Sequence, residues 1–152
     1  MKKILLTLGL AALSMQAQQD KGLQYSVSQP LVDMLIEYVD ELDCYGIEYH
    51  FGDSLRLELY DIGRVRGGGS IAGIAMGMFD DSRVEIYIDI DHWINSSQRR
   101  RRWTVYHELT HDIFNITHCE VTIMDTVVPD YISYGLMEDS IEELMNYLKK
   151  NN

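Results

Sequence analysis

The sequence is poor in positive charge. It carries 13 lysines and arginines against 24 aspartates and glutamates, which gives a formal net charge of −11. Nucleic acids and anionic membrane surfaces repel a protein of this charge. We therefore expect no nucleic-acid partner, and the acidic balance indicates solubility rather than any particular chemistry.

The N-terminal region also lacks an apolar run long enough for a membrane anchor. The run at residues 4–13 is shorter than the roughly 20 residues that a transmembrane helix needs. It follows Lys2 and Lys3 and precedes the small residue Ala17, a pattern typical of a secretory signal peptide. We predict a signal peptide over residues 1–17 and a mature domain over residues 18–152. The protein would then be exported, periplasmic or extracellular, with no membrane contact after signal cleavage.

Cysteine is scarce, with Cys44 and Cys119 as the only two. In an oxidising compartment such a pair could form a disulfide, and two buried free thiols are the alternative. Repeats, low-complexity tracts and linkers are absent. Because 46% of the residues are hydrophobic, the chain can build one core, and we predict a single globular domain.

The spacing of apolar residues predicts an α+β fold. Apolar residues recur at helical intervals after Pro30, after the candidate capping residues 95–97, and over residues 137–148. Strands are predicted over residues 47–51, 55–60 and 84–91, the last with strict alternation. The result would be a small mixed sheet, a packing helix, and a long helix ending near residue 114. An extended peptide could pair with residues 84–91 if that strand lies at the sheet edge.

The stretch H-E-L-T-H at residues 107–111 carries the strongest chemical signal. His107 and His111 would lie one turn apart on a helix, so their imidazoles could reach one ion. Glu108 is rotated by about 100° from His107 on such a helix. A carboxylate there stands beside the ion and can act as a general base. The pattern predicts a zinc site on the long helix.

A catalytic zinc usually takes three protein ligands, so a third one is needed. His118 is the nearest candidate, provided that the helix ends and the chain turns back. Asn115 tolerates the left-handed backbone that such a turn uses. The alternative is a glutamate from a later helix, namely Glu138, Glu142 or Glu143.

The stretch H-E-L-T-H-D-I-F-N-I-T-H at residues 107–118, followed by I-M-D at 123–125, resembles the signature of zincin metallopeptidases. Metzincins carry H-E-x-x-H-x-x-G-x-x-H and then a methionine turn. Small exported bacterial proteins predicted to be metallopeptidases are more similar, reading H-E-L-G-H-x-x-L-N-x-x-H and then S-I-M-N-P. The resemblance covers roughly residues 84–130. Relative to metzincins, this chain has one added residue before the third histidine, and Asn115 occupies the region of the usual glycine. Relative to the second pattern, Thr110 replaces the glycine of H-E-L-G-H, and the proline after the methionine comes later, at Pro129.

The resemblance implies a minimal zincin-like domain and a zinc metallopeptidase, a hydrolase acting on a peptide or protein substrate. It implies that Glu108 is the general base for a zinc-activated water and that Met124 lies beneath the metal. The Zn²⁺ ligands that it implies are His107, His111 and His118.

Two further points follow from the motif. Tyr131 or Tyr134 could donate a hydrogen bond to the oxyanion, as a tyrosine does in some zincins. A function of another class is a catalytically inactive zinc-binding interaction module, with Cys119 as a fourth ligand. The presence of Glu108 favours the enzyme, because a structural zinc site needs no such carboxylate.

Overall fold

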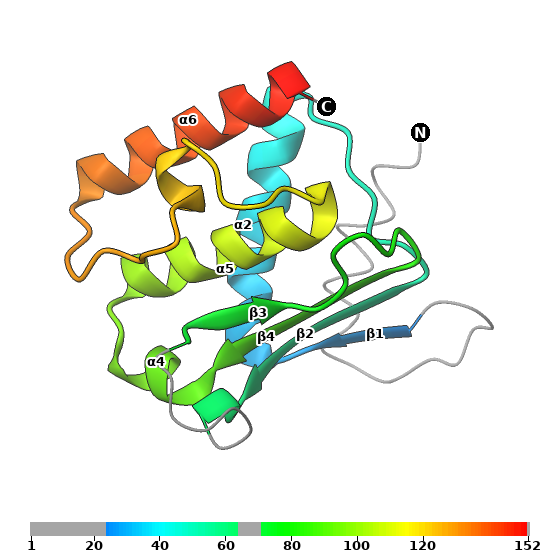
Figure 1. The fold of residues 1–152 in the computed structure, drawn as a ribbon, viewed down its shortest axis with the longest axis horizontal. Coiled ribbons are helices and arrows are strands. Elements are labelled where there is room, and N and C mark those ends of the chain that lie inside the picture. The colour runs from blue at the N-terminus through cyan, green and yellow to red at the C-terminus, as the bar shows by residue number, and fades with distance from the viewer. Residues whose placement is uncertain (1–23, 64–70, 152) are drawn as a thin grey trace.

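A computed structural model describes residues 24–63 and 71–151 (Figure 1). The predicted signal peptide at residues 1–17 lies outside the described residues. A four-stranded mixed sheet and several helices make up the fold, which confirms the predicted α+β class. In the part of the chain that the structure describes, no helix combines the length and apolarity that crossing a membrane requires.

The sheet has the strand order β1-β2-β4-β3. Strands β1 (Gln24–Val27), β2 (Ser54–Tyr60) and β4 (Arg83–Asp89) are parallel, and β3 (Gly73–Ala75) pairs antiparallel with β4. The expected alternation of β4 is present, since Val84, Ile86 and Ile88 are buried. Because β4 lies between β2 and β3, it is not an edge strand, so the condition for an extended peptide to pair with it is not met. Among the described strands, β3 is the edge strand next to β4.

The predicted strand at residues 47–51 is also wrong. This segment is irregular and follows helix α2 (Gln29–Tyr45), which ends at Gly46 with a φ of 69°. The N–H of Ile47 donates to the Leu42 carbonyl at 2.9 Å, so the segment is tied to the end of α2. Ile47 and Phe51 are buried. Their apolar character therefore reflects core packing and not strand pairing.

Helix α5 (Gln98–Phe114) is the central element of the fold. It lies against β3 and β4, and α2 and α6 (Tyr134–Asn151) pack against it. Figure 1 shows α5 between the sheet and α6. The short helix α4 (Ile90–Asn95) links β4 to α5. Because α5 is covered from several directions, every residue from 103 to 112 is buried, including His107, Glu108, His111 and Asp112.

Both ends of α5 agree with the sequence prediction. The Ser97 side chain accepts a hydrogen bond from the Arg100 N–H at 3.3 Å, which caps the N-terminus. Asn115 ends the helix in the left-handed conformation, with a φ of 54°. That turn sends the chain back along α5, and a 3-10 helix, η1 (Thr122–Met124), then packs against α5 and α6.

Candidate metal centre

Three histidines from α5 and the segment after it meet at one point. His107, His111 and His118 each offer one ring nitrogen as a ligand atom, and these three nitrogens lie within 4.8 Å of one another. The ring centroids are separated by 4.4, 4.8 and 5.2 Å. His107 and His111 are buried, whereas His118 is exposed. The group is therefore built into the core on one side and open to solvent on the other.

Hydrogen bonds to backbone carbonyls fix the tautomers of the two buried histidines. Nδ1 of His107 lies 2.8 Å from the carbonyl oxygen of Ile123, and Nδ1 of His111 is hydrogen-bonded to the carbonyl oxygen of Ile116. A carbonyl only accepts, so each Nδ1 carries the proton and each Nε2 presents a lone pair. These two Nε2 atoms lie 2.9 Å apart. Two lone pairs at this distance repel each other, and a shared cation would remove the repulsion.

Both buried rings are held in the neutral form. Burial lowers the pKa of His107 to about 4, against an opposing effect of the Ile123 carbonyl. Burial also lowers the pKa of His111. Neutral imidazole is the form that binds zinc. Tetrahedral zinc with Zn–N bonds of about 2.0–2.1 Å separates its nitrogen ligands by about 3.4 Å. The observed spacings, from 2.9 Å to at most 4.8 Å, bracket that value.

The 3-10 helix η1 packs against α5 beside His107. Met124 is fully buried there, and its neighbour Ile123 supplies the carbonyl that orients His107. Such a hydrogen bond fixes the ring orientation of a ligand histidine. Sequence reasoning identified Met124 but missed Ile123 and Ile116, because both act through backbone atoms that their side chains do not reveal.

Glu108 lies beside the histidines on the side of the edge strand. Its carboxyl group is buried, and the backbone of Ala75 forms a hydrogen bond with it. Burial raises the pKa of Glu108 to about 8, with Ala75 opposing the rise and Asp112 adding to it. A Cβ at Gly73 would lie 2.7 Å from Glu108 Cγ. The strand therefore approaches Glu108 closely because residue 73 has no side chain.

Asp112 ties α5 to the sheet. Its Oδ2 accepts from the N–H of Gly77 at 2.7 Å and from the N–H of Glu85 at 3.3 Å. Burial raises the pKa of Asp112 to about 6, and the two backbone N–H groups oppose that rise. None of its described hydrogen bonds is to one of the three histidines. Asp112 instead holds β4 and the segment that follows β3 against α5.

A cleft of about 610 Å³ opens over the histidines. Strand β3 and the segment after it run alongside α5 in the same direction, since Gly73 approaches Glu108, the N–H of Gly77 donates to Asp112, and the N–H of Phe79 donates to Asn115. Arg100 lines the cleft near the start of α5, and Met78 also lines it. The lining residues are Ile71, Ala72, Gly73, Ala75, Met78, His92, Arg100, His107, Glu108, His111, Thr117, His118, Thr126, Val127, Val128 and Asp130.

Several predicted site residues do not join this group. Tyr131 and Tyr134 are 78% and 68% exposed, and neither lines the cleft. Cys119 is not part of the histidine cluster, and both Cys44 and Cys119 are free thiols.

The three candidate glutamates of α6 also lie apart from the cluster. Glu143 accepts from the Thr122 N–H at 2.9 Å, and Glu138 contacts Arg102 at 3.4 Å. Within the described ranges, the group that could hold a metal comprises only the three histidines.

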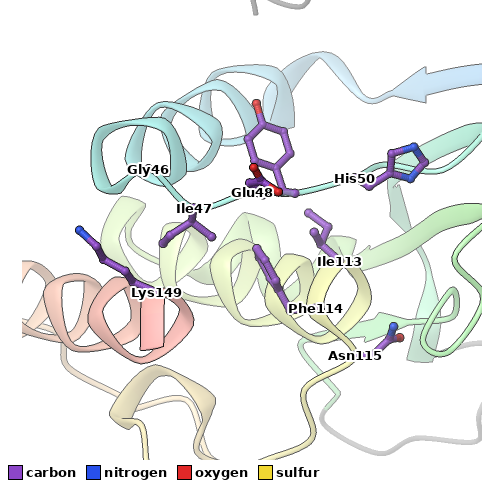
Figure 2. Close-up of a pocket in the computed structure, with 9 residues that line it drawn as sticks. Gly46, Ile47, Glu48, His50, Ile113, Phe114, Asn115 and Lys149 are labelled. Atoms are coloured by element: carbon purple, nitrogen blue, oxygen red, sulfur yellow. The ribbon is translucent and has the colours of Figure 1, made fainter. Parts of the chain in front are cut away.

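A second cavity, of about 740 Å³, lies elsewhere on the molecule (Figure 2). The chain that leaves α2 at Gly46, the end of α5, and Lys149 of α6 surround it. His50 is its only histidine, and the Nδ1 atom of that ring accepts from the Gly52 N–H at 2.9 Å. Its charged groups do not converge on one point in Figure 2, so the cleft over the three histidines is the better candidate site.

Comparisons with known proteins return no match of any kind: no family model, no curated protein and no solved structure is similar to this chain.

Proposed function

We propose that the protein is a zinc-dependent metallopeptidase with His107, His111 and His118 as metal ligands and Glu108 as general base. The observation that supports this most directly is the pair of Nε2 lone pairs facing each other at 2.9 Å. A third imidazole lies beside them and a buried carboxylate is next to them. This arrangement at the bottom of an open cleft resembles the site of a zincin.

The donor set favours zinc over harder cations. Three neutral imidazoles suit zinc and other late transition metals, whereas calcium and magnesium prefer oxygen ligands. With three protein ligands, a catalytic zinc keeps a position for water or substrate. When bound, zinc would supply Lewis acidity toward water and toward a substrate carbonyl.

The chain itself would position the substrate and move the proton. Gly73 and Ala75 of β3 line the cleft, and the strand pairs with β4 along its other edge. An extended peptide can add to a free strand edge through backbone hydrogen bonds, which favours a peptide substrate. A cation held by the histidines would favour the carboxylate form of Glu108 over the protonated form that burial favours. In that form Glu108 would take a proton from water and pass it to the leaving amine. The Ala75 backbone and the close approach of Gly73 hold that carboxylate in place.

The test is cleavage of a diverse peptide library by the zinc-loaded protein, with products identified by mass spectrometry. Wild type should cleave, Glu108→Ala should bind zinc at the same stoichiometry without cleaving, and Glu142→Ala, at an exposed position of α6, should behave as wild type. Activity in Glu108→Ala would contradict its role as the base. Zinc binding without cleavage by wild type would contradict the peptidase and favour the zinc-binding interaction module.

A further inference from the structure

The four consecutive arginines at residues 99–102 have different surroundings. The side chain of Arg101 donates to the Trp93 carbonyl at 2.6 Å and lies over the Trp93 ring at 4.9 Å. Arg102 lies 3.1 Å from Glu37 and also contacts Glu41 and Glu138. These two side chains hold α5 to its neighbouring elements. Arg99 makes one long contact, 3.4 Å, to the Ile132 carbonyl.

Arg100 is the arginine that lines the cleft. Its side-chain ion pair is with Asp130, at 3.5 Å, and the Asp130 side chain is fully exposed. Its buried Nε has no hydrogen-bond partner among the described residues. An exposed ion pair of this length contributes little, because both groups stay solvated and the side chains keep their freedom. Arg100 therefore places a positive charge in the cleft, and its ion pair with Asp130 adds little to the stability of the fold.

The position of Arg100 on α5 places it in line with the metal ligands. Residues seven apart on a helix point in nearly the same direction and are about 10.5 Å apart along the axis. Arg100, His107 and His111 therefore form one stripe along the floor of the cleft. An extended chain advances about 3.3 Å per residue. A peptide lying along β3 would bring a group about three residues from the reacting bond close to Arg100.

Other charges near this end of the cleft do not replace Arg100. His92 also lines the cleft, and its Nε2 is engaged with Thr104 Oγ1 at 2.9 Å. Asp130 is the acidic group at the same end. Since Asp130 is exposed and its contact with Arg100 is long, a substrate carboxylate can take its place beside the guanidinium.

We propose that Arg100 binds a carboxylate of the substrate and gives the cleft a preference for peptides with that group about three residues from the cleaved bond. This inference rests on the proposed peptidase function. The carboxylate could belong to an aspartate or glutamate side chain or to the C-terminus of the peptide, because the guanidinium recognises the same chemistry in each.

The test uses two random-sequence peptide libraries, one with free C-terminal carboxylates and one with C-terminal amides. Zinc-loaded wild type, Arg100→Gln and the matched control Arg99→Gln are compared. Products enriched in aspartate or glutamate at one position in the amidated library would identify a side-chain carboxylate. Cleavage confined to the free-acid library, at a fixed distance from its end, would identify the C-terminus.

Arg100→Gln should lose this preference, with kcat/KM for the best acidic peptide reduced about tenfold or more, mainly through KM. Arg99→Gln should keep the preference. An uncharged version of the same peptide should be cleaved equally by wild type and Arg100→Gln. A preference that Arg100→Gln retains, or that wild type lacks in both libraries, would overturn the inference while the peptidase function stands.

A binding readout separates the two proposals. Immobilised, metal-free wild type and Arg100→Gln are incubated with the same libraries, and the retained peptides are sequenced. Enrichment of acidic or free-acid peptides on wild type alone would support the role of Arg100 even if cleavage failed. Equal retention of these peptides by both proteins would contradict it.

Discussion

Asp112 accepts a hydrogen bond from the N–H of Gly77 at 2.7 Å, and this contact fastens the segment that follows β3 to helix α5. The contact has no room for a side chain at residue 77. A Cβ there would lie 2.5 Å from Asp112 Oδ1 and 2.7 Å from the Arg83 carbonyl oxygen. The second of these atoms belongs to the backbone of the neighbouring strand, so it cannot move aside cheaply.

Gly77→Ala should therefore destabilise the protein by about 1–3 kcal/mol, the usual range for overpacking a filled site. The measurement is the free energy of unfolding from urea titration. Gly135→Ala is the matched control, because a Cβ at Gly135 in α6 has nothing within 4 Å. That variant should keep or slightly raise the stability, since alanine is the better helix former. Equal stabilities of the two variants would contradict the close packing at Gly77.

Gly73→Ala should impair catalysis rather than metal binding. The added Cβ would lie 2.7 Å from Glu108 Cγ and 2.8 Å from its Oε1, so the carboxylate must shift. A displacement of about 1 Å in a catalytic group can reduce the rate about a hundredfold. We expect kcat on a cleaved peptide to fall at least about tenfold, while the zinc stoichiometry, measured by atomic absorption, is unchanged. Full activity in this variant would mean that the position of Glu108 is not critical.

The sequence was informative where a residue acts through its side chain and a regular spacing. The capping residues 95–97 and the turn-forming Asn115 predicted the two ends of α5. The helical spacing of His107 and His111 predicted that these two side chains meet. The structure also shows what Thr110 does. Its hydroxyl donates to the Tyr106 carbonyl at 2.8 Å, so the Tyr38 hydroxyl, 2.9 Å away, donates to Thr110.

The short strand β3, its pairing and the burial of Asp112 depend on tertiary contacts, which produce no recognisable pattern in the local sequence. Strand β3 has only three residues, Gly73–Ala75, and its alternation is too short to recognise. Its partner could not be predicted either, because the connection from β2 to β4 passes through β3, and spacing does not reveal which strand lies at the edge. Asp112 can be buried because the N–H groups of Gly77 and Glu85 become its hydrogen-bond partners in the folded chain, which the local sequence does not reveal.

Metal binding should stabilise the fold through the histidine cluster. A ligand at a thousand times its Kd stabilises the native state by about 4 kcal/mol, so zinc should raise the Tm by several degrees over that in chelator. His107→Ala should abolish most of this rise. His50→Ala, at an exposed histidine outside the cluster, should retain it. A rise that His50→Ala loses or that His107→Ala keeps would place the zinc elsewhere.

His92 should make the stability depend on pH in a defined direction. Burial lowers the pKa of His92, and the charge of Arg100 lowers it further, against an opposing effect of Asp89. As the pH falls through the unfolded value of about 6.5, the unfolded chain binds a proton that the native state does not yet bind, so stability is lost. His92→Gln should therefore lose less stability than wild type between about pH 7.5 and pH 5. The measurement is the difference between the two unfolding free energies at each pH, in chelator, so that bound metal does not contribute. A difference that stays constant over this range, or that grows in favour of wild type on acidification, would contradict the lowered pKa of His92.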